Sequence, residues 1–242
     1  MLYRIVIYPH QKQDSLINLL SDQEHYLRRV VRLNNGQNFI AMDGKGYSWE
    51  VKLTDKGGEI IHVIEENREL SIEVTLMVAL PKGNGFEDII RCTTELGVNK
   101  LQPVISHRTL LKPSENKWER WHKIAVESAE QSERQIVPYI AKPIPVMEAF
   151  TTMKKLNIPK YIAVARTDAP HLLNFLTRDL WDSPSQIIIA TGCEGGWNTD
   201  EIQWAIASNF QEVSLGKRIL RAITAPITAM SLISGVMETN NK

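Results

Sequence analysis

The chain has 242 residues, 43% of them hydrophobic, and its formal net charge at pH 7 is +0. A chain of this size can bury a large core and can form one big domain or two modest ones. Because it is neutral, no overall field attracts it to nucleic acid, and any contact with RNA or DNA must come from local basic patches.

The first part of the chain has the pattern of a small β-rich module. Residues 3–8 form a predicted strand, and Ser21 and Glu24 have the spacing of a capping box at the start of a helix that runs to about Arg32. Three further strands, separated by turns that contain glycine, are predicted at residues 39–42, 47–53 and 59–63. This spacing predicts a small barrel, and the polar residues 65–69 are the expected linker that follows it.

From Ile72 onward, strands alternate with helices, as in an α/β domain. The predicted strands are residues 74–80, 101–105, 161–165, 186–190 and 212–215. The predicted helices are residues 86–96, residues 118–134, one that Asn198 caps with Glu201 at its third position, and a last one with Pro226 as its first residue. The chain is therefore expected to comprise two domains, residues 1–70 and 71–242.

Two loops near the end of the chain are the most informative feature. Residues 191–197 and 216–221 each follow a short apolar strand directly. In open α/β sheets, ligands bind at the carboxyl ends of the strands, so two such loops predict a small-molecule site. A tight connection is an equally good explanation of Gly192, Gly195 and Gly196, whose spacing is neither a dinucleotide fingerprint nor a phosphate loop.

Charged residues elsewhere admit both functional and structural explanations. Arg218 and Arg221 fit phosphate recognition, or are two solvated arginines beside a turn. Glu130 and Arg134 are four residues apart on a predicted helix, where a surface ion pair is the ordinary interpretation. Three arginines of one short helix suit an RNA backbone, or form a solvated face: Arg28, Arg29 and Arg32.

The remaining features concern compartment, metal and oligomeric state. Cys92 and Cys193 lie far apart in sequence, which argues against a disulfide framework or a cysteine zinc site and favours a cytoplasmic protein. No apolar run suggests a signal peptide or a membrane span, and the histidines lack metal-ligand spacing, so neither a membrane nor a metal is expected. The last helix carries an apolar stripe that suits either the core of the chain or a contact between subunits: Ile227, Met230, Ile233 and Met237.

Together, these residues resemble one family. The segments 191–197 (TGCEGGW) and 215–225 (LGKRILRAITA) look like the paired C-terminal motifs of the bacterial 16S rRNA (uracil-N3)-methyltransferase family, ribosomal RNA small subunit methyltransferase E. Four other segments agree with the family, so the resemblance covers nearly the whole chain: 25–32, 82–83, 94–98 and 130–138. The chain departs from the family pattern at Cys193, where proline is usual, at Ile223, where glutamate is usual, and at His107, where an acidic residue is common.

The resemblance implies a SPOUT-class methyltransferase with an N-terminal PUA-like β-barrel for RNA and a C-terminal α/β domain with a deep trefoil knot. It implies methyl transfer from S-adenosyl-L-methionine to N3 of a uridine in 16S ribosomal RNA or the small ribosomal subunit, by a homodimer. The implied cofactor contacts are Thr191, Gly192, Glu194, Gly195, Leu215, Gly216, Ile219, Leu220 and Ala225. Arg221 and Arg134 are the candidates for stabilising the uracil anion or its neighbouring phosphates, and the candidates for RNA contacts are Arg28, Arg29, Arg32 and Arg218. No general base is assigned.

Three functions of different class remain open at this point. The first is an active RNA methyltransferase. The second is a catalytically weak RNA-binding or ribosome assembly factor on the same scaffold, which has lost turnover through Cys193 and Ile223. The third is an α/β enzyme for an unrelated small molecule. Stabilisation by S-adenosylmethionine separates the first from the third, and methyl transfer to RNA separates the first from the second.

Overall fold

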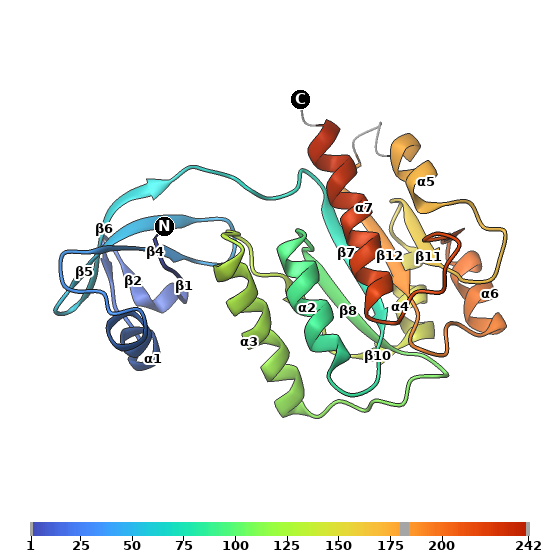
Figure 1. Ribbon diagram of the computed structural model, residues 1–242, viewed down its shortest axis with the longest axis horizontal. Helices are drawn as coiled ribbons and strands as arrows, with labels where there is room; N and C mark the ends of the chain where they lie inside the picture. Colours follow the sequence, from blue (N-terminus) through green and yellow to red (C-terminus); the bar gives the residue numbers. More distant parts are fainter. Residues whose placement is uncertain (1, 180–183, 241–242) are drawn as a thin grey trace. The chain divides into compact units, whose positions relative to one another are not determined.

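The chain forms two compact units in the computed structural model, which describes residues 2–179 and 184–240 (Figure 1). The first unit comprises residues 1–69 and 126–137, and the second comprises residues 70–125 and 138–242. The two predicted domain ranges include Met1, residues 180–183 and residues 241–242, which lie outside the described residues. The division after Glu69 falls one residue before the expected boundary, whereas the placement of residues 126–137 with the first unit was not expected.

The first unit is built on a six-stranded sheet with the strand order β1-β4-β5-β6-β3-β2. Its strands are β1 (Arg4–Val6), β2 (Lys12–Gln13), β3 (Leu16–Ile17), β4 (Asn38–Met42), β5 (Ser48–Thr54) and β6 (Gly57–Ile64). Neighbouring strands are antiparallel except β1 and β4, which are parallel. Alternate strand residues such as Phe39, Ala41, Val51 and Leu53 form one buried cluster, as period-2 alternation requires. The predicted strands at 39–42, 47–53 and 59–63 are confirmed.

The helical segment of this unit differs from the prediction. A 3-10 turn, η1 (Pro9–Gln11), precedes α1 (Ser21–His25), which continues as a π-helix, η2 (Tyr26–Val30). The N-cap is Leu20, whose N–H donates to Oε1 of Gln23 at 2.8 Å, so the predicted Ser21–Glu24 capping box is wrong by one residue. The helical segment ends before Arg32, which has the left-handed backbone angle φ of 60° and cannot continue a right-handed helix.

The second unit contains a parallel sheet with the order β10-β8-β7-β12-β11-β13, and β9 pairs with β8 (Figure 1). Its strands are β7 (Glu73–Ala79), β8 (Lys100–Ile105), β9 (Tyr139–Ile140), β10 (Ile144–Pro145), β11 (Lys160–Ala163), β12 (Gln186–Thr191) and β13 (Gln211–Val213). All the pairings are parallel, which confirms the predicted α/β class.

Helices cover both faces of this sheet. They are α2 (Gly85–Glu95), α3 (Glu115–Gln131), α4 (Val146–Lys154), α5 (Leu172–Asp179), α6 (Thr199–Ala207) and α7 (Thr224–Asn240). Helix α7 packs against α2, α5 and β12, whereas α4 packs against α6 and β8. Ile188 lies in the cluster beneath α4 and α6, and its neighbour Ile189, on the other face of β12, is equally buried. The prediction that β12 is buried on both faces is therefore confirmed.

The apolar stripe of α7 belongs to the core of the chain itself. Met230 and Ile233 are fully buried and Met237 is nearly so, in a helix that packs on α2, α5 and β12. For these three side chains the explanation as intrachain core is confirmed, and they are not available for a contact between subunits. Ile227, the fourth residue of the stripe, is only partly buried. None of the helices in the described part of the chain has the length and apolar content needed to cross a bilayer.

Candidate functional site

A cavity of about 640 Å³ lies at the carboxyl ends of β11, β12 and β13. Three segments line it: residues 163–169, which begin at the last residue of β11, residues 192–197, which follow β12, and residues 214–220, which follow β13. Parallel strands bring their carboxyl ends to one edge of the sheet, and for this reason loops that are distant in sequence meet here. The volume is that of a typical small-molecule site.

Eight of the nine predicted cofactor contacts line this cavity. They are Gly192, Glu194, Gly195, Leu215, Gly216, Ile219, Leu220 and Ala225. The ninth, Thr191, is the last residue of β12 and is fully buried behind the cavity wall. The structure thus brings together the two loops that the sequence singled out, although their role in binding a cofactor stays a prediction.

Glycine is required in the first loop by the path of the backbone. A Cβ atom on Gly192 would lie 3.2 Å from Cα of Gly196 and 3.4 Å from N of Trp197, so a side chain there would push the loop apart. Gly196 has a φ of 66°, and its N–H donates to the Cys193 carbonyl at 2.8 Å. At Gly195 the first obstacle to a Cβ is the flexible side chain of Arg108, 2.7 Å away. Gly192 is therefore a sharper probe of the loop than Gly195.

Glu194 connects the first loop to the segment that precedes α2. Its Oε1 accepts a hydrogen bond from the N–H of Lys82 at 3.0 Å. Lys117 holds the same segment from the other side, because its Nζ donates to the Gly83 carbonyl at 2.9 Å. Ile223, which stands where the family usually has glutamate, packs against Gly85, the first residue of α2. A Cβ atom on Gly85 would lie 3.0 Å from Cδ1 of Ile223. Glu194 therefore holds the first loop against the segment that precedes α2.

Sequence reasoning missed Arg108 and the 163–169 loop. Arg108 lines the cavity, and its guanidinium donates to the carbonyls of Gly195 and Trp197. Both features follow strands of the same sheet, Arg108 after β8 and the loop after β11. The rule that ligands bind at the carboxyl edge would have found them if every predicted strand had been followed to its end.

Two buried polar atoms suggest what kind of ligand the cavity suits. Nε1 of Trp197, a residue that lines the cavity, and Oγ1 of Thr191 behind it have no hydrogen-bond partner among the described residues. A buried donor or acceptor without a partner costs about 1–3 kcal/mol. Apolar Leu215 and Leu220 line the same space. A ligand with both polar groups and an apolar body therefore fits this wall.

The predicted arginines lie in different places. Arg218 lines the cavity, and Arg221 is exposed in the same loop. Arg29 and Arg32 are exposed in the first unit, whereas Arg28 is held by its own unit. The Arg28 guanidinium donates to Glu24 at 3.3 Å, to Asn35 at 2.8 Å and to the Thr54 carbonyl at 2.6 Å.

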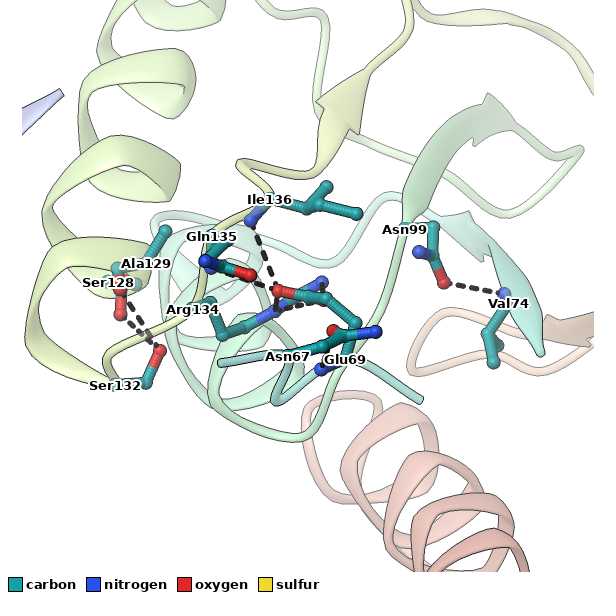
Figure 2. Close-up of polar contacts among 10 residues, drawn as sticks. All are labelled: Asn67, Glu69, Val74, Asn99, Ser128, Ala129, Ser132, Arg134, Gln135 and Ile136. Carbon is teal, nitrogen blue, oxygen red and sulfur yellow. Dashed lines mark hydrogen bonds and ion pairs between the residues drawn. The ribbon is translucent and has the colours of Figure 1, made fainter. Parts of the chain in front are cut away.

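Arg134 belongs to the first unit and forms a buried ion pair. Its Nη2 lies 2.5 Å from Oε2 of Glu69, and the two side chains are only 4% and 8% exposed (Figure 2). Oε1 of Glu69 also accepts the N–H groups of Gln135 and Ile136, at 3.1 Å each. Arg134 is not among the residues that line the cavity, whereas Arg218 is.

Glu130 does not form the expected surface ion pair with Arg134. Its Oε1 accepts the N–H of Val6 at 2.7 Å, while Arg134 lies beyond the end of α3 and binds Glu69. Burial raises the pKa of Glu130 to about 7, although the Val6 hydrogen bond opposes the shift, and Glu127 adds to it. The predicted surface ion pair is wrong, because each side chain binds a partner distant in sequence: Glu130 binds Val6, and Arg134 binds Glu69.

The described residues include no group of three or more histidine, cysteine or acidic side chains placed to hold a metal ion.

The chain matches known proteins over both units. The family described as "RNA methyltransferase domain" matches residues 68–234, and the one described as "RNA methyltransferase PUA domain" matches residues 21–66. The chain is 45% identical to ribosomal RNA small subunit methyltransferase E of Synechocystis sp. over 99% of this chain and 79% of that protein. It is 30% identical to the protein of the same name from Bacillus subtilis, over 90% of this chain and 89% of the relative.

A solved structure agrees with these relatives. The crystal structure of ribosomal RNA small subunit methyltransferase E from Neisseria gonorrhoeae, bound to S-adenosyl methionine, superposes with a TM-score of 0.85. Its sequence is 28% identical, and the match covers 98% of each chain.

Proposed function

Because the chain belongs to the ribosomal RNA small subunit methyltransferase E family, we propose that it transfers a methyl group from S-adenosylmethionine to N3 of a uridine in 16S ribosomal RNA. It has the fold class of that family, a PUA-like N-terminal domain and a C-terminal α/β domain of the SPOUT type, built on a parallel sheet. The observation that carries the proposal is the cavity at the sheet edge, which is lined by both glycine-containing loops.

The loops around the cavity would hold the cofactor. The close approach of Gly192 to Gly196 keeps side chains out of the floor of the loop, so backbone groups face the ligand. Trp197 offers an unpartnered Nε1–H, and Leu215 and Leu220 offer apolar contact. When bound, S-adenosylmethionine supplies a methyl group activated by its sulfonium. Holding donor and acceptor in line would account for much of the acceleration.

Arg221 is the residue that we propose stabilises the negative charge on the uracil. Methylation at N3 requires loss of the imide proton, and a cation beside the ring favours the anion that remains. Arg221 is exposed in the loop that lines the cavity, and Arg218 precedes it in the cavity wall. Arg134 was assigned the same task by the resemblance. Arg134 forms an ion pair with Glu69 in the first unit, and its part in catalysis stays a prediction.

The substrate would be 16S ribosomal RNA or the small ribosomal subunit, and the compartment the cytoplasm. We also propose a homodimer, on the basis of the resemblance to SPOUT enzymes, which pair through the region of the last helix. Since one face of α7 fills the core of its own chain, the contact would use the other face, where Ser231 and Gly235 are exposed. Light scattering at micromolar concentration tests this part: a monomeric mass with activity retained would remove it.

Calorimetry with S-adenosylmethionine tests the cofactor site. The wild-type protein should bind, and Gly192→Val should lose most of the affinity because its Cβ atom meets the backbone of Gly196. Gly36→Val is the matched control, since the space around that glycine is open and it lies in the first unit, although its φ of 89° adds local strain. A wild-type protein that does not bind the cofactor would favour an α/β enzyme for another small molecule. Binding without methyl transfer would favour the assembly factor.

A further inference from the structure

The first unit carries an exposed stacked pair of aromatic rings that the proposed site does not use. The rings of Tyr47 and Trp49 are nearly parallel, at 17°, with centroids 6.4 Å apart. Nζ of Lys12 lies 5.6 Å from the centroid of the Trp49 ring, within the range of a cation–π contact. We call Lys12, Tyr47 and Trp49 the aromatic platform.

The two rings have different roles in the unit. Trp49 is partly buried against the core cluster and pairs across the sheet with Ala41 and with Val63. Tyr47, which lies two residues before Trp49 in the loop that precedes β5, is 64% exposed. Val63, directly opposite Trp49, is also half-exposed. Tyr47 therefore adds little to the core and presents most of its ring surface to solvent.

The loop that carries Tyr47 is held firmly. Oδ1 of Asp43 accepts the N–H groups of Lys45 at 2.8 Å and Tyr47 at 3.0 Å, and the N–H of Asp43 donates to the Tyr47 carbonyl at 3.0 Å. Gly46 donates to the Gln135 carbonyl at 3.2 Å, within the same unit. Because these bonds already order the backbone of the loop, a ligand that stacks on the Tyr47 ring does not have to order it.

We propose that the aromatic platform stacks an unpaired nucleobase of the RNA substrate on the open face of Tyr47, with Lys12 and Lys45 near the flanking phosphates. Isolated exposed aromatic residues are ordinary. The platform differs from them because it combines parallel rings, a cation over one ring and a rigid loop. These are the elements with which proteins bind single-stranded nucleic acid, since every base has a face that can stack. The proposal deepens the proposed function and rests on it.

The platform also offers a contact that the three predicted arginines do not. Arg28 is engaged by Glu24, Asn35 and Thr54, so the basic helix has fewer free cations than its sequence suggests. Stacking is insensitive to salt, whereas phosphate contacts weaken as counterions accumulate. The two kinds of contact can therefore be separated by experiment.

The test is fluorescence anisotropy with full-length protein and a labelled oligouridylate of about a dozen nucleotides, measured across a salt series. Tyr47→Ala should weaken binding about fivefold or more, with an unchanged salt slope, because one base loses its stacking partner. Tyr47→Phe keeps the ring and should bind within about twofold of wild type. The control is Tyr3→Ala, at a tyrosine that is 44% exposed and on which no ring stacks in the described part of the chain.

A second measurement protects against a folding defect. An oligomer containing 4-thiouridine should cross-link to the peptide that contains Tyr47 and Trp49 in the wild-type protein. Equal affinity in Tyr47→Ala and wild type, or cross-links that avoid this peptide, would overturn the platform. So would a wild-type protein that leaves the oligomer unbound. None of these outcomes affects cofactor binding or methyl transfer, so the failure of the platform is distinguishable from failure of the proposed function.

Discussion

Glu130 makes the stability of the first unit depend on pH in a way that one substitution should abolish. Burial raises the pKa of this carboxyl from 4.5 to about 7, with the Val6 N–H as its one opposing hydrogen bond. The folded state therefore binds the proton more tightly than the unfolded state does. The stabilisation is fully present below pH 4.5 and is lost as pH rises to about 7.

The size of the effect follows from the shift. One pKa unit corresponds to about 1.4 kcal/mol, so the shift amounts to roughly 3 kcal/mol between pH 4.5 and pH 8 as an upper estimate. Glu130→Gln keeps an oxygen that can accept from Val6 and removes the charge. The variant should come close to wild type at pH 4 and should be more stable at pH 8 by up to about 3 kcal/mol.

Hydrogen exchange of peptides from β1 and β4 reports the local free energy of opening in this unit. Exchange at pH 8 should be slower in Glu130→Gln than in wild type. Glu119→Gln, at an exposed glutamate of the same helix, should change it little. A Glu130→Gln protein with the pH dependence of wild type, or one less stable at pH 8, would show that Glu130 is not the source of the pH dependence.

Three further predictions concern other charged groups. Arg221→Ala should lower the single-turnover rate of methyl transfer at saturating RNA by about 10²–10³, the usual cost of one group that stabilises a developing anion, while cofactor affinity by calorimetry stays the same. The double variant Arg29→Gln, Arg32→Gln should weaken RNA binding and reduce the salt slope by about 1.5. Arg28→Gln should change the slope less and lower the urea midpoint more, because Arg28 is bonded within its own unit. An equal loss of slope in both variants would count against this difference between the arginines. Glu69→Ala should destabilise the first unit by about 3–5 kcal/mol, because it leaves the Arg134 charge buried without that partner, and an unchanged urea midpoint would contradict the structural role of the pair.

Local patterns predicted much of the fold and of the site. The strands that became β7, β8, β12 and β13 were visible as short apolar runs, and Asn198 caps α6 as its spacing indicated, with Glu201 N–H donating to its side chain at 2.7 Å. The glycine-containing loops were found because each follows a strand directly. These signals act within a few residues and can therefore be read from sequence.

What the sequence did not reveal depends on distant partners. Glu69 and Arg134 are 65 positions apart, and Val6 and Glu130 are 124 apart, so no spacing rule connects them. Those pairs also explain why residues 126–137 belong to the first unit although α3 begins in the second. Helix α4 was missed because it begins directly after Pro145 without a side-chain cap. The trefoil knot came from the resemblance alone, since threaded connections are nearly absent among folds.

The most direct test of the account is mass spectrometry of 16S ribosomal RNA after small subunits from a strain lacking this protein are incubated with the purified protein and methyl-labelled S-adenosylmethionine. The label is expected in 3-methyluridine at one position, and Arg221→Ala protein should produce far less of it in the same time. Ribosomal RNA without the label, from a protein that binds the cofactor in calorimetry, would contradict the proposed transfer and leave an RNA-binding assembly factor on the same scaffold.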